Sequence, residues 1–193
     1  QWDNKRNSRL QSIKDKQKYG KKPTKQQREL YIKHNNRIND YLSKAAKKVI
    51  NYCIENDIGV LVLGYNDTFQ RNSNMKKKNN QTFVHIPFGK LKDKLEYLCQ
   101  LNGLRYVVQE ESYTSQASFF DQDDIPVYEK NNPSSYTFQG TRTKRGLYKT
   151  RQNYKFNADV NGALNILKKS NVVSLEALYA RGEVDTPMRI RMA

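Results

Sequence analysis

The chain has 193 residues, enough for one buried core with a small appendage. Its 35 Lys and Arg against 19 Asp and Glu give a formal net charge of +16, which is typical of nucleic-acid binders and shared by basic ribosome-like proteins. No apolar run reaches the roughly 20 residues of a membrane span, and no signal peptide is visible. Cys53 and Cys99 fall within helical apolar patterns, so we expect reduced core cysteines in a cytoplasmic protein.

The N-terminal third predicts two helices. Residues 1–22 predict a short helix that leads into a basic loop. Thr24 and Gln27 then form the capping-box pattern of a second helix start. Apolar residues recur at helical spacing from there to Ile54, with Lys and Arg on the opposite face. His34 lies within the apolar stripe, where a packed or surface histidine is a commoner role than a ligand.

Two apolar runs predict neighbouring strands. Residues 60–65 form a continuous apolar run, as in a strand buried on both faces of a parallel sheet, and residues 104–108 predict the next strand. A polar loop with Lys76–Lys78 and a helix with leucines on one side separate them. This alternation predicts an α/β fold, a largely parallel sheet flanked by helices.

Residues 119–155 differ in kind and predict an irregular insertion or a small β-hairpin. Asp121, Asp123 and Asp124 lack the glycine and terminal glutamate of a calcium loop, so we expect a polar turn. A later basic segment interleaves positive charges with one aromatic ring. This suits contact with a nucleic-acid backbone and stacking on a base, and it equally suits a solvated hairpin. Its residues are Lys144, Arg145, Tyr148, Lys149 and Arg151.

Two acidic positions are the candidates for chemistry. Glu110 and Glu111 follow the second apolar run, at the carboxyl end of a predicted strand, where open α/β sheets form binding crevices. Because side chains alternate along a strand, one should face a site and the other the opposite surface. Asp159 opens a predicted helix, where a carboxylate can cap the helix, the role that spacing alone favours, or bind a metal ion. Carboxylates around divalent ions are what metal-dependent cleavage of nucleic acid requires.

Two motifs resemble a known family. Tyr113-Thr114-Ser115-Gln116 is followed by the run Asn-Ala-Asp-Val-Asn-Gly-Ala-Leu-Asn-Ile at residues 157–166. In this order they resemble the C-terminal end of TnpB (OrfB-type transposase) proteins, the transposon-encoded, RNA-guided DNA nucleases related to type V CRISPR effectors. Supporting segments lie at residues 39–42, 58–66 and 86–91, so the resemblance covers roughly residues 1–170.

The resemblance implies a RuvC-like domain of RNase H fold, with DNA and guide RNA as partners and three carboxylates that bind magnesium. Asp159 matches the last of these acidic residues. The family's middle glutamate usually ends the strand matched by residues 60–66, where this chain has Gly64-Tyr65-Asn66. Some branches carry the glutamate just before the Thr-Ser motif. Glu111 occupies that place, and Glu110 is the second choice.

The chain also departs from the family. The Gly-Ile-Asp strand that holds the first acidic residue is absent, and Asp3 is a poor substitute. Family members often carry two Cys-x-x-Cys pairs, a zinc ribbon, between the Thr-Ser motif and the last acidic residue. Here Ala117 stands near the position of the first of these cysteines, and residues 119–155 contain no cysteine, so we expect no zinc. These departures, with Gln1 in place of Met, predict a C-terminal fragment of a longer protein.

We therefore expect an incomplete RNase H-like, RuvC-type fold. Residues 1–118 and 156–170 would form the nuclease domain, residues 119–155 would replace a zinc ribbon, and residues 171–193 would be a tail. The isolated chain is expected to be inactive or severely impaired. One alternative is a non-catalytic nucleic-acid-binding module, and another is a degenerate product without a stable fold, since missing strands would uncover the apolar 60–65 run.

Overall fold

The computed structural model describes residues 2–16, 23–66, 87–129, 136–184 and 187. The side chain of Asp3, the Lys76–Lys78 loop and the basic segment at residues 189–191 lie outside this description. In chain order the elements are α1 (Trp2–Asp15), α2 (Lys25–Glu55), β1 (Val60–Gly64), α4 (Phe88–Leu101), β2 (Arg105–Gln109), β3 (Thr141–Lys144), β4 (Leu147–Lys149), β5 (Lys155–Asn157), α5 (Ala158–Ser170) and α6 (Glu176–Arg181).

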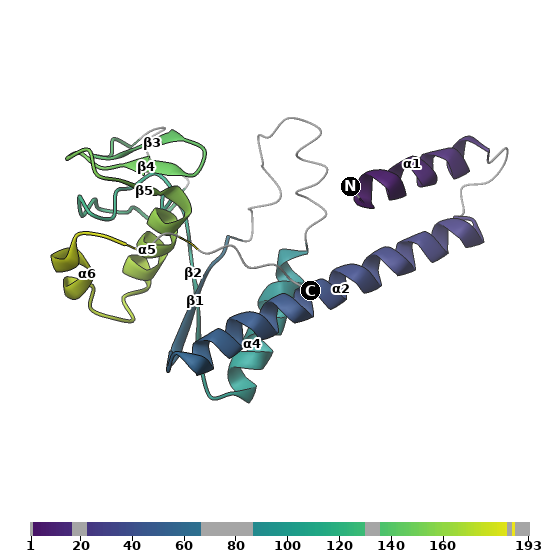
Figure 1. The fold of residues 1–193 in the computed structure, drawn as a ribbon, viewed down its shortest axis with the longest axis horizontal. Coiled ribbons are helices and arrows are strands. Elements are labelled where there is room, and N and C mark those ends of the chain that lie inside the picture. The colour runs from purple at the N-terminus through teal and green to yellow at the C-terminus, as the bar shows by residue number, and fades with distance from the viewer. Residues whose placement is uncertain (1, 17–22, 67–86, 130–135, 185–186, 188–193) are drawn as a thin grey trace.

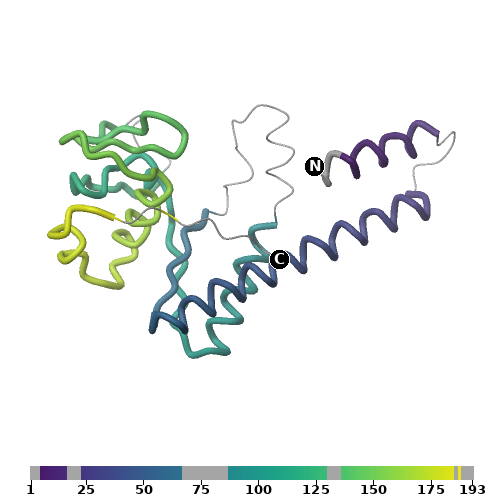
Figure 2. The backbone as a smooth tube through the Cα atoms, in the orientation of Figure 1, coloured from purple at the N-terminus to yellow at the C-terminus, as the bar shows by residue number. Residues whose placement is uncertain are grey.

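The first two helices form an antiparallel pair, in which α1 runs back along the first half of α2 (Figure 2). The predicted capping box is confirmed. The Thr24 hydroxyl accepts the Gln27 amide at 3.2 Å, and the Gln27 side chain accepts the Thr24 amide at 2.8 Å. The second half of α2 buries Leu42, Ala46 and Ile50 at helical spacing and packs against α4.

The parallel pair β1–β2 lies between two sets of helices (Figure 1). Val60 pairs with Arg105 and Gly64 with Gln109, so the predicted parallel pairing is confirmed. One face of the pair packs on the α2–α4 core, and α5 contacts both strands. The core residues of this layer are Ala46, Ile50, Cys53, Leu95, Cys99 and Leu104, with Leu61, Leu63 and Tyr106 against them.

The prediction of full burial for the first apolar run is wrong. Every residue of β1 is only half-buried, because β1 has a single strand neighbour among the described residues. Both cysteines are buried free thiols, as predicted, and burial raises the pKa of each. In the described part of the chain, no helix combines the length and the apolarity that a membrane crossing requires.

The C-terminal half contains the predicted β-hairpin, which turns at Gly146 with a φ of 79°. Strands β3, β4 and β5 form one antiparallel sheet, so a domain boundary between residues 155 and 156 would fall inside β5. An aromatic cluster joins this sheet to α6, which lies within the predicted tail. Its ring centroids are 4.7–5.8 Å apart, and its members are Phe119, Phe120, Tyr148, Tyr154, Phe156 and Tyr179.

Candidate active site

Glu111 lies where β1, the end of β2 and α5 meet. A Cβ atom added to Gly64 would be 2.9 Å from Glu111 Oε2 and 2.4 Å from Ile166 Cδ1, so the carboxylate occupies the space above this glycine. The buried Thr114 fixes the turn after β2, since its hydroxyl donates to the Glu111 carbonyl at 2.8 Å. Burial, followed by the negative charge of Glu110, raises the pKa of Glu111.

Glu110 is held by Lys169 of α5 rather than facing the opposite surface. The expected alternation fails because β2 ends at Gln109, and the next residues turn: the Ser112 amide donates to Glu110 Oε1 at 2.7 Å. Lys169 Nζ forms an ion pair with Glu110 and also donates to the carbonyls of Ser112 and Pro126. Burial raises the pKa of Glu110, but the bonds from Lys169 and Ser112 outweigh it and leave the pKa below its ordinary value.

The helix α5 is capped by Asn157, so the capping role that spacing favoured for Asp159 is wrong. Asn157 Oδ1 accepts the amides of Asp159 at 2.8 Å and Val160 at 3.1 Å, as an N-cap side chain does. The Asp159 side chain is 83% exposed and lies 3.7 Å from the guanidinium of Arg142 on β3. Its carboxylate is therefore open to a ligand at the first turn of the helix.

One stripe of α5 connects the two carboxylates. Asp159, Gly162, Ala163 and Ile166 share a face, because their spacing is i, i+3, i+4 and i+7. Glu111 lies beside Ile166 at one end, and Asp159 stands two turns away, roughly 10 Å along the helix axis. Only glycine and alanine lie between them on this stripe.

This spacing has a chemical meaning. A pair of magnesium ions about 4 Å apart, each about 2 Å from its ligands, spans roughly 8 Å between outer carboxylates. Two carboxylates at opposite ends of such a pair of ions need not contact each other. Within the described residues, no group of three or more Asp, Glu, His or Cys side chains could hold a metal ion. Glu111 and Asp159 therefore supply at most part of such a site.

Two asparagines on another face of α5 hold the segment that follows Glu111. Asn161 donates to the Ala117 carbonyl at 2.8 Å and accepts the Phe119 amide at 3.1 Å. Asn165 donates to the carbonyls of Thr114 and Ala117. Both side chains are fully buried. Both residues belong to the 157–166 motif, but the motif alone indicates no role for their side chains; the signal in the sequence is a pair of amides four residues apart on one face of the helix.

The predicted basic segment divides into surface and core. Lys144, Arg145 and Arg151 are exposed and Lys149 is half-buried. Tyr148 is fully buried, and its hydroxyl donates to the Gln116 carbonyl at 2.7 Å. The stacking role predicted for Tyr148 is wrong, because alternation along β4 turns its ring into the aromatic cluster.

The aspartates of this region form the predicted polar turn. Asp123 accepts the Ser118 amide at 2.8 Å and the Gln139 amide at 3.1 Å. Asp121 accepts the Arg151 amide at 3.0 Å. These carboxylates therefore have a structural role. By binding backbone amides, they hold Gln139, just before β3, next to Ser118.

Two family profiles and one solved structure are similar to this chain. The OrfB_IS605 profile, described as "Probable transposase", matches residues 1–70, and the profile of the Cas12f1-like TNB domain matches residues 88–166. A chain in the cryo-EM structure of the Cas12f1–sgRNA–target DNA complex has a similar fold, with a TM-score of 0.60 at 18% identity. That match covers 86% of this chain and 40% of the Cas12f1 chain. No curated protein matches.

Together, the two profile matches and the Cas12f1 match support a TnpB-family (OrfB-type transposase) protein, one of a class of transposon-associated proteins. The two profiles follow each other along the chain in the order in which the sequence motifs occur. The α/β architecture, with one small parallel and one small antiparallel sheet, is the one shared with Cas12f1.

Gly64 provides a direct test of the space that Glu111 occupies. The change Gly64→Ala should lower the free energy of unfolding by about 1–3 kcal/mol, because the new methyl group overlaps Ile166 and the Glu111 carboxylate. Gly59→Ala is the matched control, since no atom lies within 4 Å of its added Cβ. Urea unfolding of both variants measures the difference, and equal stabilities would contradict the described position of Glu111.

Proposed function

We propose that this chain forms the RuvC-like, RNase H-type nuclease region of an RNA-guided DNA endonuclease. The observation that supports it most is the Glu111 carboxylate, held with a raised pKa at one end of the α5 stripe that carries Asp159 at the other. In this proposal Glu111 and Asp159 are magnesium ligands, and Glu110 positions Glu111 through the Lys169 ion pair. Bound magnesium would activate water for attack on a phosphodiester and stabilise the leaving oxygen.

A third carboxylate is required by the same proposal. The family's Gly-Ile-Asp strand is not among these 193 residues, and in the described sheet β1 pairs on one side only, with β2. A strand added to the other edge of β1 would bring its side chains close to Gly64, over which Glu111 lies. In this proposal, residues 1–193 without such a strand are inactive or severely impaired.

Guide RNA and DNA are the proposed partners. The net charge of +16 favours binding to polyanions, and Lys144, Arg145 and Arg151 are exposed on or beside the hairpin. The similar Cas12f1 structure is a complex with sgRNA and target DNA. We place the protein in the cytoplasm, where buried thiols such as Cys53 and Cys99 stay reduced.

The test joins this chain to a strand with the Gly-Ile-Asp motif and supplies guide RNA, target DNA and magnesium. Glu111→Gln and Asp159→Asn should each reduce cleavage more than about 100-fold, because each removes a metal ligand. Glu96→Gln, on the exposed surface of α4, is the charge-matched control and should cleave normally. Unchanged cleavage by either ligand variant would refute the proposed site.

A non-catalytic nucleic-acid-binding module is the second candidate. The observation that favours it is the absence, within the described residues, of a complete carboxylate cluster. The same experiment separates the two candidates. If the extended chain binds guide RNA and DNA at normal affinity but never cuts, the binding module is correct.

Glu111→Gln should also stabilise the protein when magnesium is absent. A carboxyl whose pKa is raised by folding loses stability as pH rises through the interval between its unfolded and folded pKa values. At neutral pH the buried charge is therefore unfavourable, and its removal should raise Tm. Below the unfolded pKa the carboxyl is protonated in both states and the difference should vanish. Thermal unfolding in EDTA across pH 4 to 8 measures this, and a lower Tm at pH 7 would contradict it.

A further inference from the structure

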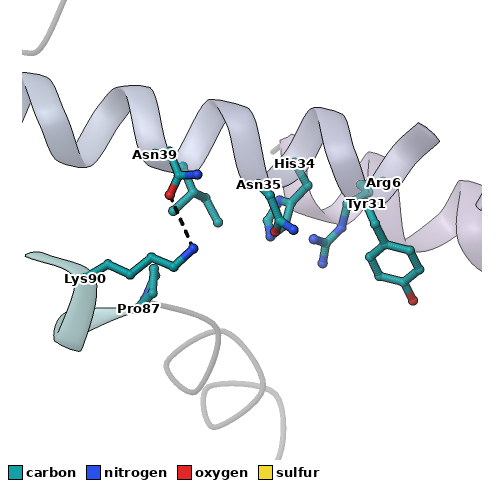
Figure 3. A pocket seen from close by; sticks show the side chains of 8 residues that line it. Arg6, Tyr31, His34, Asn35, Asn39, Pro87 and Lys90 are labelled. Atoms are coloured by element: carbon teal, nitrogen blue, oxygen red, sulfur yellow. Dashed lines mark hydrogen bonds between the residues drawn. The ribbon is translucent and has the colours of Figure 1, made fainter. Parts of the chain in front are cut away.

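A pocket of about 220 Å³ lies between α1, α2 and the start of α4 (Figure 3). In the fold, α1 and the first half of α2 lie on the opposite side of the view from α5 (Figure 1). The walls of the pocket come from three helices, and none of its side chains has a place in the proposed active site. The lining residues are Arg6, Tyr31, His34, Asn35, Ile38, Asn39, Pro87 and Lys90. They include two full positive charges, one histidine and two amides, and no carboxylate.

Arg6 is the most informative of these residues. The residue is only 8% exposed. Its Nε and Nη2 donate to Oδ1 of Asn7, which is a neutral amide oxygen. Among the side chains that the structure describes, no carboxylate pairs with it. A guanidinium that is this buried is costly unless an anion compensates its charge, so the pocket is built for a negative ligand.

The other walls favour the same ligand. Lys90 extends from α4 across the pocket and donates to Asn39 Oδ1 at 3.4 Å (Figure 3). The helix α4 begins at the pocket, and its N-cap, Pro87, makes no side-chain capping bond. The positive end of the helix dipole therefore adds to the charges of Arg6 and Lys90. Adding a Cβ to Gly89, in the first turn, would meet no atom within 4 Å, which leaves room for close approach.

We propose that this pocket binds a backbone phosphate of single-stranded nucleic acid, with Arg6 and Lys90 as the two cationic contacts. Its volume suits a phosphate group with part of one nucleotide. Tyr31, 43% exposed at the rim, is positioned for an adjacent base. This inference rests on nucleic acid as the partner of the chain, and it does not require the chain to cut.

The test measures binding of fluorescent single-stranded RNA and DNA of equal sequence to the 193-residue chain in EDTA. Arg6→Gln should weaken binding about tenfold, because a charge-assisted bond to phosphate is lost. It should also reduce the slope of log K against log salt by about 0.7. Arg9→Gln is the matched control: it removes the same charge from the exposed surface of the same helix and should change both quantities less. The RNA and DNA arms show which strand occupies the pocket.

Lys90→Gln provides a second variant in case Arg6→Gln unfolds the protein. Lys90 is exposed, so its replacement should leave Tm unchanged while weakening binding several-fold relative to Lys94→Gln on the same helix. Relative to chloride at equal ionic strength, inorganic phosphate should raise the Tm of the unmodified chain more than that of Lys90→Gln, because the general stabilisation by phosphate is common to both proteins.

Equal affinity and equal salt slope for the pocket variants and their controls would overturn the proposal. Because magnesium is absent and Glu111 and Asp159 are unchanged, a failed cleavage test does not affect this result. Conversely, the extended chain carrying Arg6→Gln and Lys90→Gln could cut normally and bind guide RNA and DNA with unchanged affinity. That result would refute the proposed pocket and would not contradict the proposed active site.

Discussion

Lys169→Met should lower the free energy of unfolding by about 3 kcal/mol, or about 10 °C in Tm. The Lys169 side chain is 7% exposed, and its ammonium group joins Glu110 to the carbonyls of Ser112 and Pro126. Methionine fills a similar volume but leaves the Glu110 carboxylate and two carbonyls without this donor. Chemical denaturation in urea at pH 7 measures the loss.

The pH dependence of this loss has a definite sign. Folding lowers the pKa of Glu110, so its contribution to stability is present above the unfolded pKa and disappears as pH falls through the folded pKa. The penalty of Lys169→Met should therefore shrink in acid. The double variant with Glu110→Gln should lose less than the sum of the single changes, because the two side chains interact directly. Strict additivity would contradict the ion pair.

Asn161→Ala should destabilise the protein by about 3 kcal/mol. The change removes two hydrogen bonds at a fully buried site and leaves the Phe119 amide without its acceptor. Since the same bonds hold the segment between Glu111 and the aromatic cluster against α5, cleavage by the extended chain should fall as well. Thermal and urea unfolding measure the first effect, and the cleavage assay measures the second.

Two further variants sharpen the asparagine test. Asn51→Ala, on the exposed face of α2, should be nearly neutral and controls for the loss of an amide as such. Asn161→Asp keeps an oxygen for the Phe119 amide but buries a charge that cannot donate to Ala117, so its stability should fall as pH rises. An Asn161→Ala variant as stable as Asn51→Ala would show that this contact is dispensable.

Local patterns in the sequence were sufficient for the elements. The capping box of Thr24, the long amphipathic helix and the hairpin follow from local spacing, and the parallel pairing of the two strands follows from the alternation of helices and strands along the chain. The half-burial of β1 did not follow, because it depends on which strands lie beside it. The inward turn of Tyr148 could have been predicted from alternation along a strand, had the short strand β4 been recognised.

The details of the site depended on contacts that no local pattern encodes. Glu110 and Lys169 are 59 residues apart, and Asn161 meets the Ala117 carbonyl across 44 residues. The choice between Asn157 and Asp159 as helix cap depends on the extended backbone of Asn157, with φ −67° and ψ 130°. The metal-ligand roles of Glu111 and Asp159 stay predictions, based on the family resemblance and on their common stripe.

Asn157 is both the last residue of β5 and the cap of α5, so no linker separates the hairpin sheet from the helix that carries Asp159. A strand of nucleic acid that tilts this sheet must carry the first turn of α5 with it. In the proposed nuclease, nucleic-acid docking on this sheet and the position of Asp159 would then be coupled through one peptide unit, without a hinge to absorb the motion.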